Sequence, residues 1–220
     1  MTVEDREPTS GTGRPSAGHV GLAVAILAAV AALLVLWPHT PRAPGDRSPE
    51  AGFARDMQVH HAQAVHMAFV IRDKTTDPTL RTIAYDIITS QQQQSGQMAA
   101  WLQTWDLPAT GTEPPMAWMA GHTGHGSSPT ARTPGVMPGM ATPAQLSQLE
   151  RDEGGSAERL FLTLMIDHHQ GGVLMADAVL ASTKQPQVRR LAAAIASSQR
   201  AEIEQMTQLL AKRGTPGSQG

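Results

Sequence analysis

The chain of 220 residues contains no cysteine, which excludes disulfide bonds, thiolate metal sites and cysteine nucleophiles. Aromatic residues are scarce, with three Phe, four Trp and one Tyr, whereas Ala, Leu, Gln and Met are common. This composition favours helices over sheets. Basic residues are not in excess, since 17 Lys and Arg stand against 19 Asp and Glu. The near-neutral balance argues against nucleic-acid binding, which usually needs a basic surface.

One long apolar run stands near the N-terminus. Residues 1–19 before it are polar, rich in Gly, Pro, Ser and Thr, and predict a disordered tail. Residues 20–37 carry no charge and would form about 27 Å of helix, close to the hydrocarbon thickness of a bilayer. The Pro-rich linker that follows, 38–50, is a poor context for signal cleavage. We therefore expect an uncleaved single-pass transmembrane anchor.

The charges that flank this run do not decide its orientation. Two arginines precede it and two follow it closely, so the positive-inside rule gives a tie. A short N-terminal tail and a long following domain are typical of a signal anchor. We therefore expect the large C-terminal domain on the extracytoplasmic side.

The rest of the chain contains an internal repeat. A shift of 108 residues aligns 53–98 with 161–206 without a gap. The identical pairs include Phe53 with Phe161, Met57 with Met165, His60 with His168, His61 with His169, Pro78 with Pro186, Gln91 with Gln199 and Met98 with Met206. Such a gap-free match of uncommon residues at a single offset is very improbable by chance, so we infer an internal duplication.

Each copy of the repeat predicts a helical hairpin. Apolar residues recur at helical spacing over 53–74 and 156–181. Prolines suited to a first helical turn begin the next helices, which extend over about 78–105 and 186–212. Two antiparallel hairpins predict an all-α fold, a four-helix bundle, over residues 51–214.

The bundle domain divides into three predicted parts. The first hairpin covers 53–106, a flexible connection rich in Met, His, Gly and Pro covers 107–141, and the second hairpin covers 142–213. Near the start of the third part, Thr142 to Gln145 resembles a capped helix start. We expect a short extra helix there, ended by Gly154 and Gly155.

Methionine and histidine gather on one face of each hairpin. The motif Met-x-x-His-His places its side chains within an arc of about 120° on a helix, together with the Met that follows. A methionine of the next helix lies at the same level, counted from the hairpin turn. The candidate metal ligands are Met57, His60, His61, Met67, Met98, Met165, His168, His169, Met175 and Met206.

Copper is the metal that suits this set. A single inward histidine is usually a hydrogen-bonded core residue, but burying four imidazoles costs free energy unless each has a partner. Thioether with imidazole favours copper, above all Cu(I), whereas zinc rarely takes a thioether. No Glu stands three residues before a His, and no His-Glu-x-x-His occurs. Those absences argue against a di-iron bundle site and exclude a zincin protease.

The connection between the hairpins holds a second Met/His tract. It comprises Met116, Met119, His122, His125, Met137 and Met140. A tract of this composition can bind copper loosely without a fold. The alternative is an ordinary linker in which these residues are incidental.

The pattern Phe-x-x-x-Met-x-x-His-His-x-x-Ala-x-x-Met-Ala at 53–68, and its copy at 161–176 with Gly172 in place of the first Ala, resemble the bacterial family named domain of unknown function 305. Ile203-x-x-Met206 is also similar to that family. The resemblance implies a ferritin-like bundle outside the cytoplasm, with copper binding and tolerance in some members. The first copy departs from the pattern at Gln94, where the second has Glu202, which implies a weaker or different first site.

Together these features predict a copper-binding protein anchored in a bacterial cell membrane, which sequesters or relays copper on the extracytoplasmic side. Two alternatives remain at this stage: a metal-dependent oxidoreductase built on the bundle, and a structural interaction domain. No Ser/His/Asp pattern or pair of catalytic carboxylates is evident in the sequence, which favours binding over catalysis.

Overall fold

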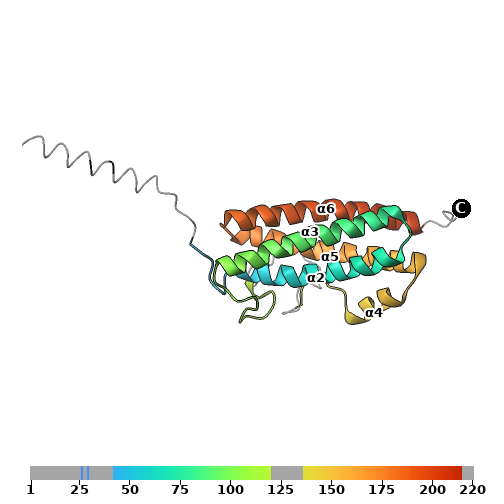
Figure 1. The fold of residues 1–220 in the computed structure, drawn as a ribbon, viewed down its shortest axis with the longest axis horizontal. Helices are drawn as coiled ribbons and strands as arrows, with labels where there is room; N and C mark the ends of the chain where they lie inside the picture. The colour runs from blue at the N-terminus through green and yellow to red at the C-terminus, as the bar shows by residue number, and fades with distance from the viewer. Residues whose placement is uncertain (1–25, 27–28, 30–41, 120–135, 215–220) are drawn as a thin grey trace, which may run out of the picture. The chain divides into compact units, whose positions relative to one another are not determined.

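The computed structural model describes residues 26, 29, 42–119 and 136–214. The predicted tail and nearly all of the predicted anchor lie outside these residues. No helix in the described part is long and apolar enough to cross a membrane. The elements in chain order are α2 (Pro49–Lys74), α3 (Pro78–Thr104), the 3-10 helix η1 (Ala117–Met119), α4 (Pro143–Arg151), α5 (Gly154–Ser182) and α6 (Pro186–Gly214) (Figure 1).

The four long helices form the predicted bundle of two hairpins. Helix α2 packs on α3, α5 packs on α6, and the hairpins meet where α2 packs on α5. The short elements η1 and α4 both pack against α2 and α5. The all-α prediction is therefore confirmed, and within the described residues all regular structure is helical.

Side-chain caps mark the starts of α2, α3 and α4. Ser48 accepts a hydrogen bond from the Ala51 amide at the start of α2, and Asp77 does the same for α3. Thr142 and Gln145 form a reciprocal capping box at the start of α4. The expected end of this short helix was wrong. Helix α4 already ends at Arg151, and the two glycines are the first residues of α5.

Both hairpin turns are tied by the same repeated arginine. Arg81 Nη1 donates to the carbonyl oxygens of Arg72 and Thr75, at the end of α2. Arg189, its copy, donates in the same way to carbonyls at the end of α5. These bonds satisfy carbonyl groups that a helix end leaves without a partner.

The two halves close on each other through an equivalent pair of bonds. Thr75 in the first turn donates to Glu158 at the start of α5. Thr183 in the second turn donates to Glu50 at the start of α2. Each hairpin turn thus touches the start of the other hairpin, which defines an approximate two-fold axis between α2 and α5.

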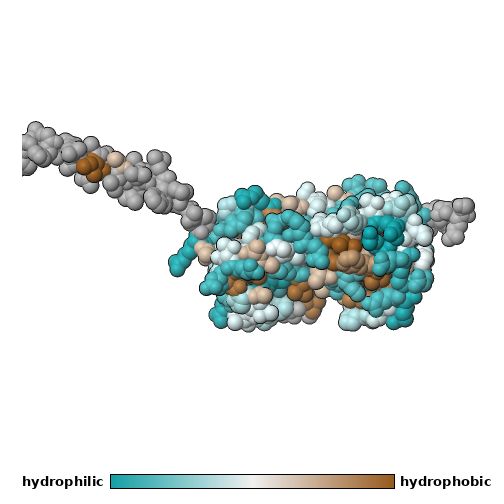
Figure 2. All heavy atoms as spheres, viewed as in Figure 1, coloured by the Kyte–Doolittle hydropathy of each residue, from teal (hydrophilic) through white to brown (hydrophobic). Residues whose placement is uncertain are grey.

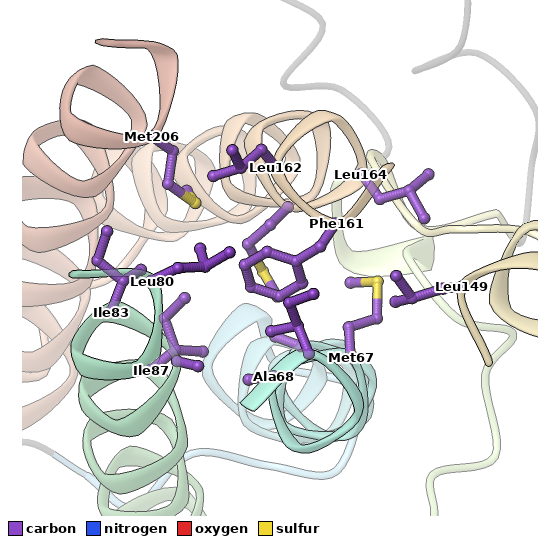
Figure 3. Packing of buried hydrophobic residues seen from close by; sticks show 14 of the residues in the cluster. Met67, Ala68, Leu80, Ile83, Ile87, Leu149, Phe161, Leu162, Leu164 and Met206 are labelled. Carbon is purple, nitrogen blue, oxygen red and sulfur yellow. The ribbon is translucent and has the colours of Figure 1, made fainter. Parts of the chain in front are cut away.

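The apolar core consists of two clusters separated along the bundle. We call them the Phe161 cluster, which includes Met67, Ile87 and Met206, and the Phe53 cluster, which includes Met98, Val179 and Ile195. Figure 3 shows the first, where Met67 of α2 and Met206 of α6 lie on either side of Phe161. The face in Figure 2 is mainly hydrophilic, with apolar residues in a few small patches.

Candidate metal centre

Four buried imidazoles form a row across the bundle between the two apolar clusters. His60 and His61 lie on α2, His168 and His169 lie on α5, and none has exposed surface. The ring centroids of His60 and His168 are 3.7 Å apart. Those of His60 and His61 are 6.5 Å apart, and those of His168 and His169 are 6.3 Å apart. The sequence suggested one ligand set in each half, whereas the structure joins both His pairs in one imidazole row.

Each end of the imidazole row is held by a side chain from the second helix of the same hairpin. His61 Nε2 is 2.8 Å from Gln94 Oε1, and His169 Nε2 is 2.6 Å from Glu202 Oε2. These oxygens accept hydrogen bonds, so Nε2 of each ring carries the proton and donates it. With Nε2 donating, the lone pair of His61 is on Nδ1, and His169 in its neutral form has its lone pair on the same atom.

The two central imidazoles differ in their partners. His60 Nε2 is 3.1 Å from the carbonyl oxygen of Pro138, which can only accept, so this ring also has its lone pair on Nδ1. His168, its copy, has no hydrogen bond on either ring nitrogen. One central imidazole is thus fixed by the connection and the other is not.

Unpaired polar atoms concentrate in this layer of the bundle. Nine buried side-chain atoms of the described residues lack a hydrogen bond: Nδ1 of all four histidines, Nε2 of His168, and both amide atoms of Gln91 and Gln199. Leaving such an atom unpaired costs about 1–3 kcal/mol, and native proteins contain few of them. Their concentration marks this layer as the part of the described bundle where polar atoms are free to bind an ion or ordered water.

Burial keeps three of the imidazoles, those of His60, His61 and His168, uncharged at neutral pH. It lowers the pKa of His60 to about 4 and that of His61 to about 3. Burial and the neighbouring His60 ring also hold the pKa of His168 well below its usual range. A neutral imidazole is the form that binds metals. At neutral pH these three rings therefore do not have to lose a proton before a metal can bind.

The six candidate methionines are all buried and flank the imidazole row along the bundle. The Phe53 cluster holds Met57, Met98 and Met175, and the Phe161 cluster holds Met67, Met165 and Met206. The pairs predicted to lie level with each other do share a cluster. Each group of three contains two methionines from one half and one from the other. Met57 and Met165 each precede a His pair by one helical turn.

The donor set fits a soft ion better than a hard one. Among the described residues, no group of three or more His, Asp or Glu is arranged to hold a metal. Zinc and hard cations usually need such a group. Neutral imidazoles with thioethers one turn away form a mixed set that suits Cu(I). Methionine side chains are flexible enough to adjust to an ion.

The second Met/His tract is only partly described. Met116 and Met119 are half-buried against the Phe53 cluster, and Met137 lines an open cavity of about 530 Å³. Met140 is half-buried close to the start of α4. The histidines of the tract lie in 120–135, outside the described residues.

A buried carboxylate that sequence reasoning missed holds the connection in place. Asp56 Oδ2 accepts hydrogen bonds from the Met116 amide and from Trp118 Nε1, each at 2.8 Å. Burial raises the pKa of Asp56. The Trp118 ring also meets Phe53 edge to face, with centroids 5.9 Å apart. The only sequence signal was a departure from the repeat, because the copy of Asp56 is Leu164.

Comparison with solved structures found close similarity. A DUF305 protein from Streptomyces coelicolor is 42% identical, with a TM-score of 0.69, and the match covers 78% of this chain and 97% of that one. A DUF305 fragment from Deinococcus radiodurans is 35% identical, with a TM-score of 0.59 and coverage of 74% and 96%.

CopM in its Cu(I)-bound form is 26% identical, with a TM-score of 0.58 and coverage of 78% and 99%. Its Cu(II)-bound and Ag-bound forms are also similar to this chain. A comparison with curated proteins found no match. The family model for domain of unknown function 305 (DUF305) matches residues 50–210 of this chain. This match covers most of the sequence, so the chain belongs to the DUF305 family.

Proposed function

We propose that this protein binds copper in the core of its bundle and sequesters or relays it on the extracytoplasmic side of a bacterial membrane. The observation that carries the proposal is the imidazole row, in which buried imidazoles lie between two groups of thioethers. The structures of CopM with Cu(I), Cu(II) and Ag support a metal of this class.

Copper is the cargo in this proposal, and the chain supplies the donors that hold it. Gln94 and Glu202 fix the rings at the two ends of the imidazole row, so that each keeps a lone pair on Nδ1. The low pKa of His60 keeps its lone pair free of a proton well below neutral pH. Thioethers from both halves then favour Cu(I) over zinc.

Binding accounts for the layer better than the two alternatives do. The imidazoles have no exposed surface, so an external substrate has no direct contact with them, which disfavours an oxidoreductase. A purely structural domain gives no reason to leave so many polar atoms of one layer unpaired.

Titration with Cu(I) in competition with a chromophoric chelator tests the proposal. We expect the full-length protein, extracted in detergent, to retain Cu(I) against the chelator and to bind Zn(II) much more weakly. A protein that releases all of its Cu(I) to the chelator would overturn the proposed function.

We also propose that residues 20–37 anchor the mature protein in the membrane. The support is the uncharged apolar run and the poor cleavage context that follows it. The intact mass of the protein extracted from membranes should therefore include the N-terminal 40 residues. A mature chain that starts near residue 40, or recovery in the soluble fraction without detergent, would contradict the anchor.

A further inference from the structure

A short segment of the connection lies directly over the imidazole row. We call residues 136–141 the strap. Its Pro138 carbonyl accepts from His60, and Gln63 of α2 makes two hydrogen bonds to Ala141. In these two, Gln63 Nε2 donates to the Ala141 carbonyl at 3.0 Å, and the Ala141 amide donates to Gln63 Oε1 at 2.7 Å. The strap is thus fastened to α2 by three hydrogen bonds.

Two glycines let the strap approach α5 closely. A Cβ on Gly171 would lie 2.0 Å from the Pro138 carbonyl oxygen, which leaves no room for a side chain. Gly139 has a φ of 75°, and a Cβ there would lie 2.2 Å from the carbonyl oxygen of Asp167. Gly171 replaces Gln63 of the first copy, so the repeat diverges at the position that seats the strap.

The strap covers one side of the imidazole row with a loop instead of a helix. Helices α3 and α6 close the two ends of the row through Gln94 and Glu202, and the apolar clusters close it along the bundle. On the strap side, the Pro138 backbone contacts His60 directly, and its strap neighbours Met137 and Met140 are half-buried. A loop held by a few hydrogen bonds opens at a lower free-energy cost than a packed helix.

The outer side of the strap adjoins an open cavity. Met137 lines this cavity together with Asp56 and Trp118, which belong to α2 and to the first part of the connection. An ion in the cavity would therefore meet a thioether before it meets an imidazole. The acidic and basic side chains of the wall are largely paired, as Arg55 is with Asp46.

We propose that the strap is the gate through which a soft monovalent cation reaches the imidazole row, with Met137 and Met140 as its outer ligands. This inference rests on the proposed function and names the route to its site. Opening breaks the bond from His60 Nε2–H to the Pro138 carbonyl, so the movement that admits the ion also releases the ring of a central imidazole, whose lone pair is on Nδ1. Thioethers at the gate favour Cu(I) or Ag(I) over hard hydrated cations.

The test compares a loosened strap with a matched control. Gln63→Leu removes both hydrogen bonds to Ala141, whereas Gln58→Leu removes one bond to a carbonyl of α2 itself. Transfer of Ag(I) from a chromophoric chelator is followed by stopped flow. We expect Gln63→Leu to accelerate uptake about tenfold or more, since it removes two of the three hydrogen bonds that hold the strap on α2. Gln58→Leu should match the parent.

A volume-conserving variant tests the outer ligands. Met137→Leu with Met140→Leu keeps the apolar side chains but removes the thioethers, so Ag(I) uptake should slow while the equilibrium affinity stays close to that of the parent. Slowed uptake with unchanged affinity supports the gate. Unchanged uptake in this variant would remove the two methionines from the proposal.

A measurement made without metal tests the opening of the strap independently of ion binding. Diethyl pyrocarbonate modifies accessible imidazoles, and mass spectrometry of peptides locates the modification. His60 should react faster in Gln63→Leu than in the parent or in Gln58→Leu. If all variants retain Ag(I) but show equal uptake and equal modification, the gate is wrong and the proposed function stands. If the parent retains neither Ag(I) nor Cu(I), both proposals fail.

Discussion

The double variant His60→Ala, His168→Ala should lose more than about 100-fold in Cu(I) affinity, because removing outer-shell partners alone already costs 10–100-fold at metal sites. These two rings meet at the two-fold axis, with centroids 3.7 Å apart, so the change removes the centre of the imidazole row. Competition titration against a Cu(I) chelator measures the loss. His66→Ala is the matched control, because His66 is about half-exposed and pairs with Glu150.

Truncation of two buried rings also leaves a cavity, so the folded state of the variant must be checked by circular dichroism. Met57→Leu with Met165→Leu avoids this difficulty, since it keeps the apolar volume and removes only the thioethers. It should weaken Cu(I) much more than Zn(II). If both variants fold and bind Cu(I) like the parent, the buried histidines serve core packing only.

Acidification from pH 7 to pH 4 should lower the free energy of unfolding of the metal-free protein by several kcal/mol. Above pH 6.5 His60 is neutral in both states, so its contribution is constant. Between pH 6.5 and about pH 4, His60 is protonated in the unfolded chain but still neutral in the folded chain. The free energy of unfolding therefore falls by about 1.4 kcal/mol per pH unit for this ring. His61 extends the loss towards pH 3.

Urea unfolding at a series of pH values measures this dependence. His60→Phe with His61→Phe removes both titrating groups while keeping aromatic side chains in place, so its stability should change less over the same range. A parent protein equally stable at pH 7 and pH 4.5 would show that the imidazoles are not held neutral by burial.

The hairpins could be predicted because their signals are local. Helix periodicity marks the buried faces, and prolines at the first turns of α3 and α6 mark the helix starts. The repeat then transfers each assignment to the other half. The levels of Met57 and Met98 followed from counting back to the turn, and both residues do lie in one cluster.

The joining of the two His pairs could not be predicted from the same signals. Periodicity shows which face of α2 is buried but not whether α5 or α6 lies opposite, and that choice places His60 against His168. The contact of the Pro138 carbonyl with His60 is even harder to predict, because every residue has a backbone carbonyl and the sequence does not show which one will be used. This carbonyl can approach α5 only because Gly171 has no side chain, and the sequence does not show that the strap packs against Gly171.

The approximate two-fold axis has a consequence for how the two halves diverged. A pair of identical hairpins assembled as a dimer would present His60 and His168 in identical surroundings on both sides of the axis. Fusion into one chain adds a single connection, and one connection cannot cover two symmetric positions. The chain therefore departs from two-fold symmetry at the central rings, where one imidazole has a backbone partner and the other has both nitrogens unpaired.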